Sequence, residues 1–130
     1  MQFDKNTLID YRIKRCMETI DEAEKALADD HLNLTANRIY YSVFYAVSAL
    51  AVKYNFSTSK HSALLSWFNK NFVKEDIINK ELGKIYNKAF LNRMKGDYDD
   101  FVNFSEESLN VDLNKMKKLV EQIIKIIKES

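Results

Sequence analysis

The sequence contains no proline and only two glycines among its 130 residues. Helix interiors exclude proline and disfavour glycine, whereas β-rich folds use both residues in their turns. Their scarcity therefore favours long helices. A hydrophobic fraction of 46% and an aromatic fraction of 12% argue against a disordered chain. At this length we expect one domain, residues 1–130, built around one hydrophobic core.

The sequence also has little cysteine, a net charge close to zero and no long apolar run. The single cysteine, Cys16, excludes an internal disulfide and a cysteine-based metal cluster, and such usage is typical of a cytoplasmic protein. A net charge of +1 lacks the basic excess of a dedicated double-strand binder, although a small basic patch for RNA or a nucleotide stays open. The most apolar stretch, residues 40–52, is shorter than the roughly 20 residues that cross a bilayer. We expect no membrane association.

Common catalytic and cofactor motifs are missing as well. The sequence has no phosphate-binding GxxxxGK[ST] loop, no GxGxxG, and no CxxC, HExxH or GxSxG motif. The two histidines, His31 and His61, lie far apart and have no carboxylate at ligand spacing. We therefore expect no metal and no cofactor.

Two segments show clear helical periodicity, one near each end of the chain. Apolar residues follow steps of three and four at Ile9, Ile13, Cys16, Ile20, Ala23 and Leu27, and again at Leu109, Leu113, Met116, Val120, Ile123 and Ile127. This spacing places the apolar side chains on one stripe of a helix. We expect both stripes to pack within a bundle.

Three further helices are expected between these two. Residues 34–54 are apolar around most of the circumference, which predicts the central helix, with Ser42, Ala46 and Ala49 as a line of small residues for close helix approach. The next helix should span about 60–73, capped by a residue of 57–59, and the fourth about 77–95, ended by a left-handed Gly96. Ser105 should cap the last helix. The expected fold is an all-α, up-and-down bundle of about five helices.

Three polar groups are candidates for function. Arg38, Tyr41, Tyr45 and Ser48 share one face of the central helix, either as an interhelical network or dimer contact, or as an arginine for phosphate with tyrosines that stack on bases. Lys60 and His61 begin a helix, where they could cap it or receive an anion. Arg93, Asp97 and Tyr98 stand either at a solvated helix end or beside a cleft.

Four motifs in order resemble a known family. They are Asn37-Arg-Ile-Tyr-Tyr-Ser-Val-Phe44, Lys60-His-Ser-Ala63, the segment 68–73, and Arg93-Met-Lys-Gly-Asp-Tyr98. From about residue 33 onward the chain resembles small prokaryotic HEPN-domain proteins, whose hallmarks are R-x-Y-Y-A-x-F, K-H-S or T-H-S, F-x-x-x-F-V and R-x-x-x-D-Y. The resemblance implies a helical bundle, often a homodimer, frequently encoded beside a minimal nucleotidyltransferase as a toxin–antitoxin type pair.

The resemblance also implies a candidate site and a possible chemistry. Better-studied HEPN toxins resemble metal-independent ribonucleases with an R-x(4–6)-H motif, in which arginine steadies the phosphate and histidine transfers a proton. Here the positions after Arg93 that would hold the histidine are Tyr98, Asp99 and Asp100, and tyrosine, with an ordinary pKa near 10, is a poor base at neutral pH. The cleft residues expected from the family pattern are Arg38, Tyr41, His61, Arg93, Asp97 and Tyr98.

Three functions compete at this stage. The first is a nucleotide- or RNA-binding partner of a nucleotidyltransferase that is not itself an enzyme, with Tyr98 as one target for nucleotide transfer. The second is an RNA-cleaving toxin that uses Arg93 with His61 or Tyr98. The third is a structural protein-interaction bundle in which the polar residues form a buried network. The adjacent gene would be the most decisive observation, and a structure that shows whether Arg38, His61 and Arg93 converge would settle most of the question of the site.

Overall fold

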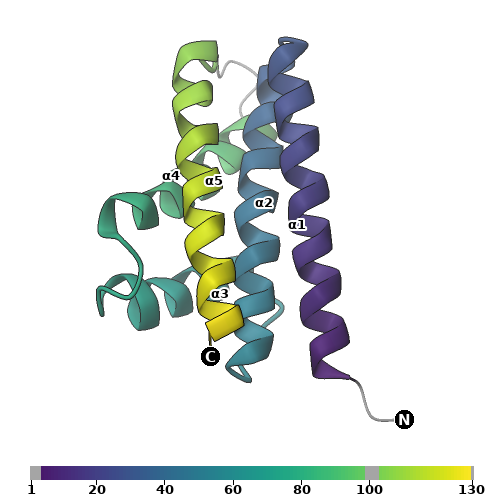
Figure 1. Ribbon diagram of the computed structural model, residues 1–130. Helices are drawn as coiled ribbons and strands as arrows, with labels where there is room; N and C mark the ends of the chain where they lie inside the picture. Colours follow the sequence, from purple (N-terminus) through teal and green to yellow (C-terminus); the bar gives the residue numbers. More distant parts are fainter. Residues whose placement is uncertain (1–3, 99–102, 130) are drawn as a thin grey trace.

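The structure is a computed structural model in which residues 4–98 and 103–129 are described. Its helices are α1 (Lys5–Ala28), α2 (Leu32–Lys53), α3 (His61–Phe68), the short π-helix η1 (Asn69–Val73), α4 (Lys80–Tyr98) and α5 (Glu106–Glu129). No strand occurs in the described residues. The expected all-α bundle of about five helices is confirmed, with α3 and η1 lying beside the long helices (Figure 1).

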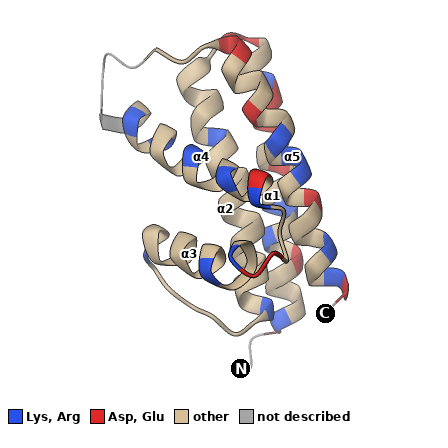
Figure 2. Ribbon diagram, turned by 90° about the vertical axis from the view of Figure 1, so that its left-hand side faces the viewer, with Lys and Arg blue, Asp and Glu red and all other residues tan. Residues whose placement is uncertain are grey.

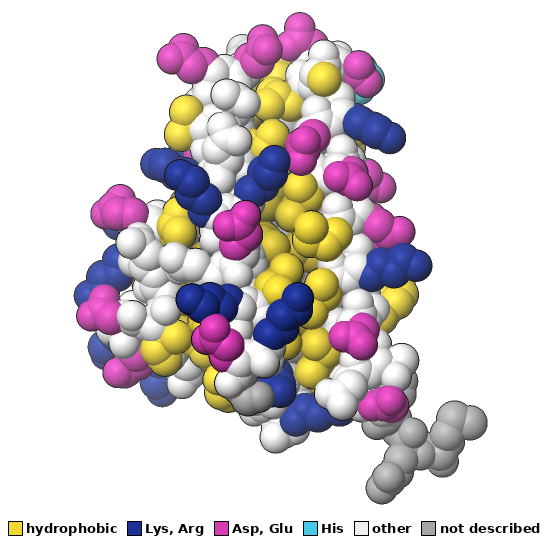
Figure 3. Space-filling model, viewed as in Figure 1, with side chains coloured by type: hydrophobic (Ala, Val, Ile, Leu, Met, Phe, Trp, Pro, Cys, Tyr) yellow, Lys and Arg dark blue, Asp and Glu magenta, His cyan; other side chains and the backbone are white. Residues whose placement is uncertain are grey.

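Helix α2 is the centre of the bundle, as its apolar circumference predicted. It packs against α1, α5 and α4, and its residues Tyr40, Val43, Val47 and Leu50 are fully buried. The small residues Ser42, Ala46 and Ala49 are also fully buried. On the surface, apolar side chains gather in a band between α1 and α5, flanked by charged residues (Figure 3). Both periodic helices therefore place their apolar stripes on the core.

The turns are made by aspartate and asparagine rather than glycine. Asp30, Asn55 and Asp76 have φ near 60°, in the left-handed region, and each stands just after a helical segment. Short polar Asx side chains enter this region more readily than other non-glycine residues. A chain with two glycines can therefore still reverse direction, and neither glycine has a positive φ.

Two expected helix signals were wrong and one was confirmed. Gly96 does not end α4, which continues in helical conformation to Tyr98. Lys60, not a residue of 57–59, is the N-cap of α3, and Thr58 instead accepts a hydrogen bond from the Lys60 main-chain N–H at 3.2 Å. Ser105 does cap α5, because its hydroxyl accepts the Ser108 N–H at 3.2 Å.

The two glycines occupy opposite environments. A Cβ at Gly83 would lie 2.8 Å from Val73 Cγ2, so α4 approaches η1 too closely there for any side chain. A Cβ at Gly96 would meet Phe104 no closer than 3.5 Å, an ordinary contact. Because valine is stiff about χ1, Val73 cannot easily move away from a side chain placed at position 83.

We predict opposite effects of alanine at the two glycines, measured by urea denaturation. Gly96→Ala should stabilise the protein by roughly 0.5–1 kcal/mol because alanine favours the helix. Gly83→Ala should destabilise it by about 1–3 kcal/mol because the close packing must open. Equal effects at both positions would contradict the close approach of α4 to η1.

Candidate functional site

The site is built around a hydrogen bond between α2 and the start of α3. The Tyr40 hydroxyl and His61 Nδ1 are 2.8 Å apart, although the residues are 21 positions apart in sequence. The His61 ring stacks on Phe44 at 4.4 Å between centroids, with an interplanar angle of 18°. Tyr40 is fully buried, whereas His61 is partly exposed. A fixed aromatic floor thus orients a partly accessible imidazole.

Burial and charge set the protonation of this pair. Burial raises the pKa of Tyr40 to about 12, partly offset by the Arg93 charge, so the phenol keeps its proton at neutral pH. Desolvation, together with repulsion from Arg93, lowers the pKa of His61 below its ordinary 6.5. The imidazole is therefore neutral at neutral pH and still has one N–H donor and one acceptor nitrogen.

Arg93, from α4, lies over the same aromatic pair. Its Cζ is 5.2 Å from the centroid of the Tyr40 ring and 5.5 Å from that of Tyr41. These are cation–π distances, at which the ring faces attract the guanidinium. The Tyr41 ring also meets the His61 ring edge-on at 6.1 Å. Arg93, His61 and Tyr41, three of the expected cleft residues, therefore converge from three helices.

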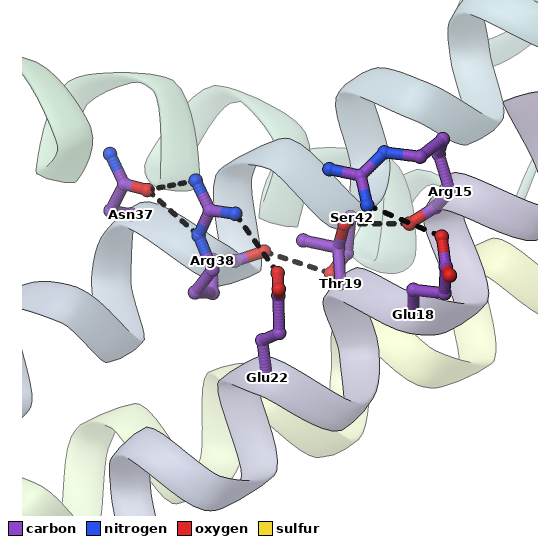
Figure 4. A network of polar contacts seen from close by, with 7 residues as sticks. All are labelled: Arg15, Glu18, Thr19, Glu22, Asn37, Arg38 and Ser42. Carbon is purple, nitrogen blue, oxygen red and sulfur yellow. Dashed lines mark hydrogen bonds and ion pairs between the residues drawn. The ribbon is translucent and has the colours of Figure 1, made fainter.

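Arg38 also lies near the Tyr41 ring but is bonded to a residue of α1. Its Cζ lies 5.3 Å from the Tyr41 centroid, while Nη1 donates to Glu22 at 3.0 Å and Nη2 to Asn37 Oδ1 at 2.7 Å. Figure 4 shows this network, which also includes Arg15, Glu18, Thr19 and Ser42 along the facing sides of α1 and α2. Arg38 thus takes part in an interhelical network, one of the two interpretations of its sequence pattern.

Three remaining candidates differ in what the structure describes. Lys60 is exposed and precedes His61 at the N-terminus of α3 without a side-chain cap. Asp97 and Tyr98 complete α4, and their side chains lie outside the described part of the structure. The expectation that these two line the cleft therefore stays a prediction. The cluster that the structure brings together consists of Arg38, Tyr41, His61 and Arg93, with Tyr40 and Phe44 beneath; we call it the tyrosine–arginine cluster.

Sequence reasoning missed Tyr40 and Phe44 as parts of the site. Both fell on the apolar circumference of α2, and tyrosine in such a position usually serves the core. No local signal separates a core tyrosine from one that holds a histidine across 21 residues. Three aromatic neighbours at 40, 41 and 44, followed by a helix-starting histidine, form the one pattern that could have raised the question.

Charge is unevenly distributed around the cluster. Figure 2 shows that α4 carries mainly Lys and Arg, whereas Asp and Glu gather at the end of the molecule near the turn between α1 and α2. The near-zero net charge of the chain is therefore not spread evenly over the described surface. Among the residues described, no group of three His, Cys, Asp or Glu side chains could hold a metal ion. No described helix is long and apolar enough to cross a membrane.

Comparison with known proteins agrees with this architecture. The family model described as HEPN domain matches residues 9–130. A UPF0332 protein of Thermotoga maritima is 41% identical over 126 residues, which covers 97% of this chain and 96% of that protein. Two proteins of Methanocaldococcus jannaschii, named "Putative toxin MJ0142" and "Putative toxin MJ0605", are 34% and 30% identical and cover 85% and 71% of this chain, and 86% and 68% of their own lengths.

The fold and the cluster thus define a small all-α bundle with an aromatic–cationic site. The chain belongs to the HEPN family, and it has relatives that are named as toxins.

We predict that Arg93→Met raises the pKa of His61, because it removes the repulsion, but leaves that pKa below 6.5, because desolvation is the larger cause. Titration of the imidazole resonances by NMR measures the change, and the exposed His31 serves as the internal control. Since the folded protein binds this proton less tightly than the unfolded chain, the wild type should also lose stability as pH falls below about 6.5. An unchanged His61 titration in Arg93→Met would contradict the electrostatic contact.

Proposed function

We propose that this protein is the nucleotide- or RNA-binding HEPN component of a toxin–antitoxin type pair whose partner is a minimal nucleotidyltransferase. The observation that carries the proposal is the convergence of Arg93, His61 and Tyr41 on one partly exposed site. Arginine forms strong charge-assisted hydrogen bonds to phosphate, and aromatic faces stack on bases. The toxin names of two relatives and the family resemblance support the partnership.

The hydrogen bond of His61 favours binding over catalysis. In the described part of the chain, the buried Tyr40 hydroxyl has His61 Nδ1 as its hydrogen-bond partner. A buried hydroxyl needs an acceptor for its hydrogen, and the imidazole nitrogen supplies one. Nδ1 then accepts the hydrogen bond from the Tyr40 hydroxyl, so the single N–H hydrogen of the neutral imidazole is on Nε2. A neutral imidazole of this tautomer donates a hydrogen bond to a phosphate oxygen and does not accept a proton at Nε2.

The two arginines have different roles in this proposal. Arg38 is tied to Glu22 and Asn37, so it holds α1 against α2 and supports Tyr41. Arg93 lies over the rings on the α4 side and is the arginine that contacts phosphate. Asp97 and Tyr98 follow it in the last turn of α4, where Tyr98 is the candidate acceptor of a nucleotide transferred by the partner.

The binding proposal is tested with Arg93→Met and a matched substitution on the same helix, Lys95→Met. Arg93→Met should weaken binding of ATP and of single-stranded RNA by at least about tenfold, because a hydrogen bond to a charged group contributes about 1.5–3 kcal/mol. Lys95→Met should change affinity by much less. Calorimetric titration measures both, and thermal melting checks that each variant folds. Wild-type protein that binds neither ligand would refute the proposal.

The partnership is tested separately by affinity purification. We expect the tagged chain to retain a nucleotidyltransferase encoded by the adjacent gene, and light scattering of the free protein to give the mass of a homodimer. Mass spectrometry after incubation with the partner and ATP would show nucleotide added to Tyr98, and Tyr98→Phe would lack it. If the adjacent gene encodes no nucleotidyltransferase and no complex forms, the partnership is wrong while nucleotide binding can still hold.

A second candidate function is a metal-independent RNA-cleaving toxin, favoured by the proximity of His61 to Arg93. If His61 instead donates from Nδ1 to the Tyr40 oxygen, Nε2 can take the proton of a 2′-hydroxyl. The 2′-oxygen then attacks phosphorus, a 2′,3′-cyclic phosphate forms, and the 5′-oxygen leaves with a proton from water. Arg93 would neutralise the charge that develops on the phosphate.

Cleavage predicts growth arrest on expression and RNA breakage in the presence of a metal chelator. Both effects should disappear in His61→Gln and Arg93→Met but persist in His31→Gln, the matched control at the exposed histidine. Intact RNA and normal growth with folded wild-type protein would remove this candidate and leave the binding proposal.

A further inference from the structure

His61 also lines a groove formed by residues of α1, α2, the segment 55–60 and α3. Figure 1 shows the end of the bundle where α1 begins and α2 ends, from which these residues come. The groove has a volume of about 560 Å³, within the range of small-ligand sites. Its walls come from α1, the second half of α2, the segment 55–60 and the start of α3. Among the described residues that line it are His61 and Phe44 of the cluster, but neither Arg38 nor Arg93.

The groove is positively charged. Lys5, Arg12 and Lys60 line it together with His61, and none of the described lining residues is an aspartate or glutamate. Arg12 Nη1 donates to the main-chain oxygen of Ser48 at 3.1 Å, and in the described part of the chain Arg12 forms no ion pair. A guanidinium has five N–H donors, so most of them remain for an anion. The arrangement suits a phosphate.

The remaining walls are aromatic and hydroxyl-bearing. Tyr11 is 59% exposed, although it lines the groove, and Phe44 and Tyr45 form the wall from α2. Exposed aromatic rings beside cations are typical of sites for single-stranded nucleic acid, where bases stack on rings and phosphates meet basic groups. Ser57, Thr58 and Ser59 add hydroxyls that can bond to sugar or base edges.

His61 and Phe44 connect the groove to the tyrosine–arginine cluster. Both line the groove, and both contact Tyr40 and Tyr41 in the cluster. A ligand that contacts His61 from the cluster can therefore continue into the groove without leaving the protein surface. An acidic peptide would use the cations but would leave the aromatic walls without a stacking partner.

We propose that this groove is a second nucleotide subsite, which binds the nucleotide next to the one held by Arg93 and so extends recognition to a short single strand of RNA. The inference rests on the proposed nucleotide-binding function. Arg12 and Lys60 meet the flanking phosphate, and Tyr11 stacks on its base. A mononucleotide occupies the cluster alone, whereas an oligonucleotide occupies both sites.

The experiment compares uridine monophosphate with a fluorescein-labelled oligouridylate by anisotropy and competition. Arg12→Gln should weaken oligouridylate binding on the order of tenfold and lower its salt dependence by about one phosphate contact, while mononucleotide affinity stays unchanged. Lys14→Gln removes an exposed charge from the same helix and is the matched control. Tyr11→Ala should likewise weaken the oligonucleotide alone, because stacking is lost.

Trp67 provides a direct readout of occupancy. Its ring stacks on that of Phe56 with 4.9 Å between the centroids and an interplanar angle of 7°. Phe56 in turn lines the groove. Since Trp67 is the one tryptophan of the chain, oligouridylate should change its fluorescence and uridine monophosphate should not. If Arg12→Gln does not fold, Lys60→Gln at an exposed position carries the same expectation.

The outcomes separate the two proposals. If Arg93→Met abolishes binding of both ligands but Arg12→Gln, Lys60→Gln and Lys14→Gln all match the wild type, the subsite is refuted while the proposed function stands. The subsite is also refuted if Arg12→Gln weakens the binding of uridine monophosphate and of oligouridylate equally. It is refuted as well if polyglutamate displaces the labelled oligouridylate as effectively as unlabelled oligouridylate does. If wild-type protein binds no nucleotide at all, the proposed function and this inference fail together.

Discussion

The site depends on the hydrogen bond between Tyr40 and His61. Tyr40 is fully buried in α2, so its ring and hydroxyl are fixed by the core, and His61 is held against it at 2.8 Å. This one contact anchors the start of α3 to the central helix and sets the plane of the imidazole. It also brings His61 beside Arg93, whose charge and the local desolvation keep the imidazole neutral. The ring contacts of His61 with Phe44 and Tyr41 add to this hydrogen bond, and Tyr41 in turn contacts the arginine of α4.

The two arginines near Tyr41 show how similar contacts serve different purposes. Each guanidinium lies between 5 and 6 Å from the ring, but Arg38 also bonds to Glu22 of α1. If Arg38 exchanged its ion pair with Glu22 for one with a phosphate, the negative charge of Glu22 would remain beside the anionic ligand. In the proposed function, Arg38 is therefore the structural arginine and Arg93 is the one that contacts the anion. Arg38, which joins α1 to α2, therefore also supports the Tyr41 ring of the proposed binding site.

Much of the fold followed from the sequence, because helix faces are set by local spacing. The stripes ending at Leu27 and Ile127 and the apolar circumference of α2 all became buried surfaces. Helix ends were harder to predict. Gly96 looked like a terminator, yet φ near 60° fell on Asp30, Asn55 and Asp76 instead. Which residue takes that conformation depends on how the next helix docks, and spacing along one helix does not contain that information.

The site was only partly predictable for the same reason. The family pattern marked His61, Arg93, Arg38 and Tyr41, and the structure brings these four together. Tyr40 was hidden because its side chain is fully buried in the core, where its ring and hydroxyl both contact the histidine. The groove was hidden because Arg12 lies outside the four motifs that carried the family resemblance. Arg12 and residues 57–60 line one groove only after the chain has folded. Local motifs indicate residues, whereas tertiary packing decides which of them share a cavity.

The tautomer of His61 tests the central claim most directly. A two-bond 15N–1H correlation spectrum at neutral pH distinguishes an imidazole protonated at Nε2 from one protonated at Nδ1. If Tyr40 donates to Nδ1, as the buried hydroxyl requires, His61 will carry its hydrogen on Nε2, and added nucleotide will shift that resonance. A hydrogen on Nδ1, with no response to nucleotide, would contradict the account of this site as one that binds phosphate.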